Sequence, residues 1–128
     1  MSRGVIASID QSALQHNLQC VRRIVGAETK ILAMIKANAY GHGLTESASA
    51  LSAADAFGVA TLDSAITLRQ QGIECPIVLM QGFLTATELE GCIQYNLTPV
   101  LHHMRQVSCL SRHQLETPLS YWLKIDTG

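Results

Sequence analysis

Short apolar runs alternate with helical patterns along the chain. Five of these runs are typical of strands in length and composition. They cover residues 31–35, 57–60, 76–80, 98–101 and 119–125. The first run is continuous, which predicts a strand buried on both faces. The segment from Val5 to Ile9 precedes all five and is a candidate opening strand.

Helical spacing of apolar residues fills the stretches between the strands. The first helix is expected after Asp10 or Ser12, either of which can cap it, and Gly26 suits its end. Four more helices are expected to start near Gly43, near Thr61 or Asp63, after Thr85, and at Met104. Strands separated by helices indicate βα units with right-handed connections and a parallel sheet.

Two α/β architectures fit this pattern. One is a complete, small doubly wound sheet, and the other is the first five βα units of a (β/α)₈ barrel, truncated before the barrel closes. A whole barrel needs eight strands and about 250 residues, whereas this chain has 128. Asp126-Thr127-Gly128 follows directly on the last strand and begins a loop, which favours the partial barrel. An open five-stranded sheet has two unpaired edges, so we expect self-association.

Composition narrows the class of partners. The net charge of -1 gives no electrostatic reason to expect nucleic acid or an anionic membrane. No apolar run is long enough to cross a membrane, and the N-terminus does not have the pattern of a secretory signal. The four cysteines form no C-x-x-C pair, so free thiols in a reducing cytoplasm are expected.

The chemistry-bearing segment begins where the first buried run ends. Lys36 leaves this strand at the end that carries the active face in βα architectures. Desolvation there would favour the neutral, nucleophilic amine, which can form a Schiff base with an aldehyde. By position alone, a lysine at a strand end usually just reaches solvent, and Gly41 and Gly43 could be ordinary turn glycines.

The complete string Lys36-Ala37-Asn38-Ala39-Tyr40-Gly41-His42-Gly43 closely resembles the cofactor-lysine motif of alanine racemases, which are fold-type III pyridoxal-phosphate enzymes. The resemblance continues through the rest of the chain. Further matching segments are residues 9–17, 57–60, 65–73, 76–83 and 122–128.

This resemblance implies specific roles. Lys36 would hold pyridoxal 5'-phosphate and act as a base or acid at the substrate Cα, with the cofactor as electron sink. Tyr40 would donate a hydrogen bond to the cofactor phosphate. Lys124 matches a lysine that is carbamylated in many family members. The implied activity of the parent protein, a cytoplasmic homodimer, is interconversion of L- and D-alanine for cell-wall D-alanine supply.

The resemblance also implies a division of the chain. Residues 1–10 would be the strand that packs with a C-terminal β domain, and residues 11–128 would be the N-terminal part of the cofactor-binding barrel. The family's second base and most of its phosphate site lie outside the matched segments, so the 128 residues alone are expected to be nearly inactive. Two alternatives are another fold-type III enzyme (a serine or broad-specificity racemase, or an amino-acid decarboxylase) and a non-catalytic fragment.

Overall fold

The computed structural model describes residues 4–128 and contains six helical segments and five strands within them. Their order is α1 (Gln11–Val25), β1 (Leu32–Met34), α2 (Lys36–Tyr40), α3 (Leu44–Ala50), β2 (Ala56–Val59), α4 (Leu62–Gln70), β3 (Ile77–Leu79), α5 (Ala86–Gln94), β4 (Thr98–Leu101), α6 (Met104–Arg112) and β5 (Trp122–Leu123). The alternation of strands and helices predicted from the apolar pattern is confirmed.

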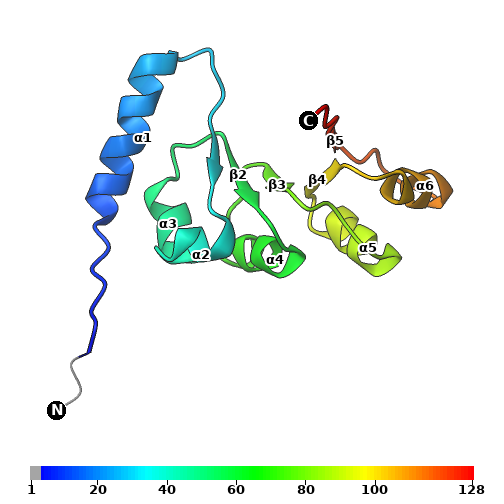
Figure 1. The fold of residues 1–128 in the computed structure, drawn as a ribbon, viewed down its shortest axis with the longest axis horizontal. Helices are drawn as coiled ribbons and strands as arrows, with labels where there is room; N and C mark the ends of the chain where they lie inside the picture. Colours follow the sequence, from blue (N-terminus) through cyan, green and yellow to red (C-terminus); the bar gives the residue numbers. More distant parts are fainter. Residues whose placement is uncertain (1–3) are drawn as a thin grey trace.

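All five strands are parallel and lie in chain order, β1-β2-β3-β4-β5. A doubly wound sheet reverses its strand order at a switch point, and this sheet does not. Figure 1 shows α3, α4 and α5 on one side of the strands, with α1 at one end of the molecule and α6 at the other. The sheet is unclosed, and the structure is therefore consistent with the predicted partial barrel.

The core forms where the three central strands meet the helices. Fully buried side chains come from both layers, and each contributes about 1.5–3 kcal/mol through removal of apolar surface from water. The largest are Phe57, Phe83, Ile35, Leu68, Ile77, Leu79, Leu89, Leu97 and Leu101. This core fixes the strands, so the loops at their carboxyl ends start from rigid positions.

Helix caps follow the sequence pattern closely. Asp10 caps α1 by accepting hydrogen bonds from the backbone N–H groups of Ser12 and Ala13, at 2.9 and 3.3 Å. Thr61 caps α4 and Thr85 caps α5 in the same way. These side chains satisfy N–H groups that have no partner inside a helix.

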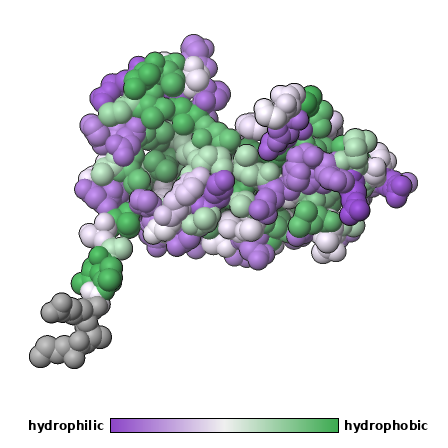
Figure 2. Space-filling view, in the orientation of Figure 1, coloured by the Kyte–Doolittle hydropathy of each residue, from purple (hydrophilic) through white to green (hydrophobic). Residues whose placement is uncertain are grey.

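The expected opening strand is wrong for this chain. Residues 4–10 belong to no strand, Val5 is fully exposed, and residues 1–3 lie outside the described part. In Figure 2 the segment beside the grey residues is hydrophobic yet surrounded by solvent. A strand needs a partner for its backbone groups, and the described residues offer none at this position.

The two outer strands are shorter and less buried than predicted. The run 31–35 forms a strand only over Leu32–Met34, and its side chains are half-buried because β1 pairs only with β2. The run 119–125 forms only Trp122–Leu123, with both residues exposed, because β5 pairs only with β4. Burial on both faces requires neighbours that an edge strand does not have.

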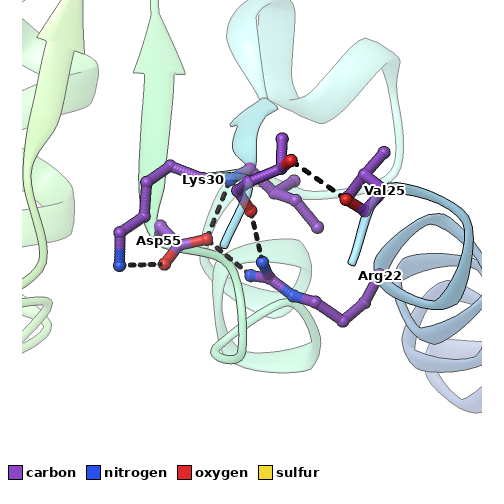
Figure 3. Close-up of polar contacts among 6 residues, drawn as sticks. Arg22, Val25, Lys30 and Asp55 are labelled. Atoms are coloured by element: carbon purple, nitrogen blue, oxygen red, sulfur yellow. Dashed lines mark hydrogen bonds and ion pairs between the residues drawn. The ribbon is translucent and has the colours of Figure 1, made fainter. Parts of the chain in front are cut away.

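A carboxylate ties α1 to the first two strands (Figure 3). Asp55 accepts hydrogen bonds from the Arg22 guanidinium, from the Lys30 amine at 3.2 Å and from the Ile31 N–H at 2.8 Å. The Arg22 guanidinium, together with the Ile31 amide, holds the pKa of Asp55 well below its usual range. Asp55 is therefore ionised in the folded chain at neutral pH.

Candidate active site

The carboxyl end of β1 brings Lys36 to the loop edge of the sheet. Ile35, between β1 and Lys36, is buried at 1% exposure, and its N–H donates to the Gly58 carbonyl at 2.9 Å. The position predicted for Lys36 is therefore confirmed. The expected desolvation of its amine is wrong, because Lys36 is exposed. Burial ends one residue earlier, at Ile35, and β1 is an edge strand with solvent beside it.

The segment after Lys36 is a left-handed turn. Ala37, Asn38 and Ala39 have φ/ψ angles of 52°/52°, 54°/45° and 51°/46°, and Tyr40 has a φ of 54°. The region α2 thus contains four successive non-glycine residues with positive φ. This conformation costs roughly 1–2 kcal/mol per residue, and such strain gathers at functional sites.

Hydrogen bonds to Asn38 hold this turn in place. The Asn38 carbonyl accepts from the N–H groups of Gly41 and Gly43, both at 3.0 Å. The Asn38 side-chain oxygen Oδ1 accepts from the Leu44 N–H at 2.9 Å. Leu44 is the first residue of α3, so the turn is joined directly to a helix whose inner side packs into the core.

The same turn presents Tyr40. Its side chain is 60% exposed, and Ala39 beside it is buried at 6%. Among residues 4–128, no hydrogen bond or ion pair involves the Lys36 amine or the Tyr40 hydroxyl, whereas Lys30 pairs with Asp55 and Lys124 with Asp126. The structure therefore places a free primary amine and a free phenol at the two ends of one five-residue turn.

Lys124 lies elsewhere. It follows β5 at the opposite edge of the sheet, is 58% exposed, and pairs with Asp126 at 3.8 Å. Four strand spacings of about 4.8 Å separate the two edges, which amounts to roughly 19 Å along the sheet. The structure therefore brings Lys36 and Tyr40 together but leaves Lys124 apart from them.

A hollow of about 340 Å³ lies between the loop after β3 and the start of α6. Its walls are Phe83, Leu84, His102, His103, Arg105, Gln106 and Cys109, so neither Lys36 nor Tyr40 lines it. The Gln106 amide organises it by donating to the carbonyls of Gln81 and Phe83, both at 3.1 Å. The hollow is therefore a neighbouring feature of the loop edge rather than the site of the lysine.

Two of the four thiols are poor nucleophiles because they are buried or partly buried. Burial raises the pKa of the Cys92 thiol to about 11 and raises the pKa of Cys75 above its ordinary value. A thiol that stays protonated is a poor nucleophile. All four cysteines are free.

Sequence reasoning missed two residues that shape the loop edge. Asn38 lies within the lysine motif, and the tolerance of asparagine for the left-handed region could have indicated its role in the turn. Gln106 carried no signal, because a glutamine in a predicted helix is ordinarily exposed, whereas here it is 5% exposed and bonded to two loops.

The residues at the turn fit pyridoxal phosphate in their chemistry. An accessible primary amine without an ion pair can condense with the aldehyde, and an unpaired phenol can donate to a phosphate oxygen. Both groups belong to one rigidly hydrogen-bonded turn at the carboxyl edge of parallel strands, where ligands of βα folds bind.

The chain is similar to alanine racemases over most of its length. Residues 9–128 match the family described as alanine racemase, N-terminal domain. The chain is 48% identical over 122 residues to an alanine racemase of Coxiella burnetii (strain RSA 331 / Henzerling II), covering 95% of this chain and 33% of that protein. It is 44% identical over 126 residues to an alanine racemase of Vibrio cholerae, covering 98% and 35%.

The solved structures agree. The biosynthetic alanine racemase of Pseudomonas aeruginosa superposes with a TM-score of 0.88 at 36% identity, covering 94% of this chain and 34% of that one. That of E. faecalis gives 0.82 at 36% identity, covering 94% and 33%. The chain thus spans about a third of the length of the relatives it matches. On the family match and on these likenesses, the chain belongs to the alanine racemase N-terminal domain family.

Proposed function

We propose that this chain is the cofactor-lysine part of a pyridoxal-phosphate-dependent alanine racemase that interconverts L- and D-alanine. One observation carries the proposal: the free amine of Lys36 and the free hydroxyl of Tyr40 stand on the same left-handed turn at the carboxyl end of β1. The implied setting is a cytoplasmic homodimer that supplies D-alanine to the cell wall. No helix among residues 4–128 has the length and apolarity to cross a membrane.

Each residue has a distinct part in this reaction. Pyridoxal phosphate, when bound, withdraws electrons from the substrate Cα and so makes its proton removable. Lys36 would hold the cofactor, and its amine would take or return that proton on one face of Cα. Tyr40 donates to the phosphate and fixes that end of the cofactor.

We propose carbamylation of Lys124 only in the whole enzyme. Carbamylation needs a neutral amine, and in this chain Lys124 forms an ion pair with Asp126. We likewise propose that residues 1–10 join another domain of the whole enzyme and that residues 11–128 are the N-terminal part of its barrel. The exposure of Lys36 supports the view that the chain alone turns over little substrate, as does a proposed phosphate contact through Tyr40 alone.

Covalent trapping tests the assignment of Lys36. The chain is incubated with pyridoxal phosphate, reduced with borohydride and digested, and the pyridoxyl mass is mapped over its three lysines. We expect the label on Lys36, because Lys30 and Lys124 each face a carboxylate. A label spread equally over the three, or absent from Lys36, would refute the assignment.

A turnover assay tests the expected inactivity of the 128 residues. L-Alanine and pyridoxal phosphate are added, and formation of D-alanine is followed with a D-specific oxidase. We expect only the slow background that free pyridoxal phosphate gives. Racemisation well above that background, lost in Lys36→Ala, would contradict the expectation while supporting the role of Lys36.

A further inference from the structure

The left-handed turn between Lys36 and Gly41 requires an interaction that stabilises its disfavoured backbone conformation. A left-handed backbone is tolerated by asparagine better than by most residues with a side chain, because its short amide can bond locally. Ala37 and Ala39 have no such group. Asn38 is therefore the residue within the turn whose side chain can hold a conformation that its alanine neighbours disfavour.

The hydrogen bonds of Asn38 reach out of the turn. Its carbonyl accepts from Gly41 and Gly43, and its Oδ1 accepts from the Leu44 N–H at 2.9 Å. The N-cap position of α3 is Gly43, which has no side chain to serve the first N–H groups of the helix. The Asn38 Oδ1 accepts from one of these N–H groups, that of Leu44, and thereby connects the turn to α3.

Helix α3, to which the Asn38 side chain is bonded, is itself held by packing. Three residues on α3, namely Ser47, Ala48 and Ala50, are buried, and α3 packs against both α1 and α4. Lys36 and Tyr40, by contrast, are exposed and make no polar contact within residues 4–128. Their placement relative to one another therefore depends on the backbone of the turn. The Asn38 side chain is one link from that turn to α3, beside the hydrogen bond from the Gly43 N–H to the Asn38 carbonyl.

We propose that Asn38 is a positioning residue: by bonding Leu44 it holds the left-handed turn so that the Lys36 amine and the Tyr40 hydroxyl face the same cofactor. This inference rests on the proposed function for the identity of the cofactor. It predicts that losing the Asn38 acceptor weakens the recognition of the cofactor phosphate while leaving the core intact.

Two substitutions in the 128-residue chain separate the effect of the Asn38 Oδ1 acceptor from the effect of its tolerance for the left-handed backbone. Asn38→Gly keeps a residue that accepts the left-handed region but removes Oδ1, and Asn38→Asp keeps an acceptor oxygen at the same place. The first readout needs no cofactor: hydrogen exchange of the Leu44 amide should speed up roughly fivefold in Asn38→Gly and stay near the original rate in Asn38→Asp.

The second readout is trapping with borohydride, using pyridoxal phosphate and pyridoxal in parallel. The label on Lys36 is measured as the ratio of labelled to unlabelled Lys36 peptide in the same digest. We expect the preference for the phosphorylated aldehyde at Lys36 to fall roughly fivefold in Asn38→Gly and to be restored in Asn38→Asp. A purely structural role would not change the ratio between the two aldehydes.

The outcomes distinguish a failure of the positioning role of Asn38 from a failure of the proposed function. If Asn38→Gly frees the Leu44 amide but keeps the original preference at Lys36, the positioning role is overturned and the proposed function stands. If Asn38→Gly loses protection in β2 and β3, Asn38 holds the fold as a whole and the positioning role is again overturned. If the unchanged chain shows no selective label at Lys36, the proposed function fails, and the role of Asn38 toward the cofactor fails with it.

Discussion

At the scale of single residues, the position of Gly82 requires a glycine because of both its backbone conformation and its close neighbours. It lies in the left-handed region at a φ of 63°, and a β-carbon there would collide with the Val100 carbonyl oxygen and lie 2.6 Å from Gln106 Nε2. We therefore expect Gly82→Ala to lower the free energy of unfolding by on the order of 3 kcal/mol. Urea denaturation followed by circular dichroism measures this change.

Gly72 provides a matched control for that experiment. Its φ is 82°, but a β-carbon there would meet nothing within 4 Å. Gly72→Ala should cost only the backbone term, about 1–2 kcal/mol. Equal losses in the two variants would show that the contact with Val100 and Gln106 contributes nothing beyond the backbone conformation.

The candidate site was predictable at this scale only in part. Lys36 and Tyr40 were found because a known motif marks them, and the apolar run before Lys36 placed it at a strand end. The left-handed turn was not predictable, since two alanines within Ala37–Ala39 ordinarily favour right-handed helix. The turn is stabilised by hydrogen bonds that include those to Asn38 from residues up to six positions later, and intrinsic propensity does not describe them.

At the scale of elements, Asp55 joins α1, β1 and β2 through a single carboxylate. Arg22 in particular lowers the pKa of Asp55, so its contribution to stability is complete above the pKa of an unfolded aspartate, about 4. That contribution is lost as the pH falls further toward the lowered value in the folded chain. We expect Asp55→Asn to unfold at lower urea than the original chain at pH 7, with the gap narrowing below about pH 4.

Asp63→Asn is the control for this pH series. Asp63 is exposed in the first turn of α4 and forms no ion pair among the described residues. Its replacement should change the urea midpoint little at any pH. A gap for Asp55→Asn that stays constant from pH 7 to pH 3 would mean that lost packing, rather than lost charge, explains the destabilisation.

Elements were predictable where local signals and tertiary packing agree. Asp10, Thr61 and Thr85 cap helices as their sequence positions indicate, and the three inner strands appear where their apolar runs stand. The errors fall on segments whose partners decide their state. Val5–Ile9 has an apolar pattern but no neighbouring strand among residues 4–128, and the run 119–125 shortens to two residues at an edge. Pattern identifies a segment able to pair, whereas pairing itself requires a second strand.

At the scale of the whole molecule, the open sheet leaves hydrophobic side chains in solvent beside an unpaired edge. Exposed residues near β5 are Tyr121, Trp122, Leu123 and Ile125. β5 pairs only with β4, so the backbone groups of its outer edge have no partner among residues 4–128. Such an edge recruits another strand. We therefore expect the chain to self-associate with increasing concentration, as measured by sedimentation velocity.

A charge on this edge should weaken the association, because a second copy would have to bury it. Leu123 is 61% exposed on β5, and Leu84 is 78% exposed in the loop after β3. Leu123→Lys should weaken self-association roughly tenfold, equivalent to about 1.4 kcal/mol, and Leu84→Lys should leave it unchanged. Association that weakens equally in both variants would point to general hydrophobic contact, and a monomer at all concentrations would contradict pairing through the open edge of β5.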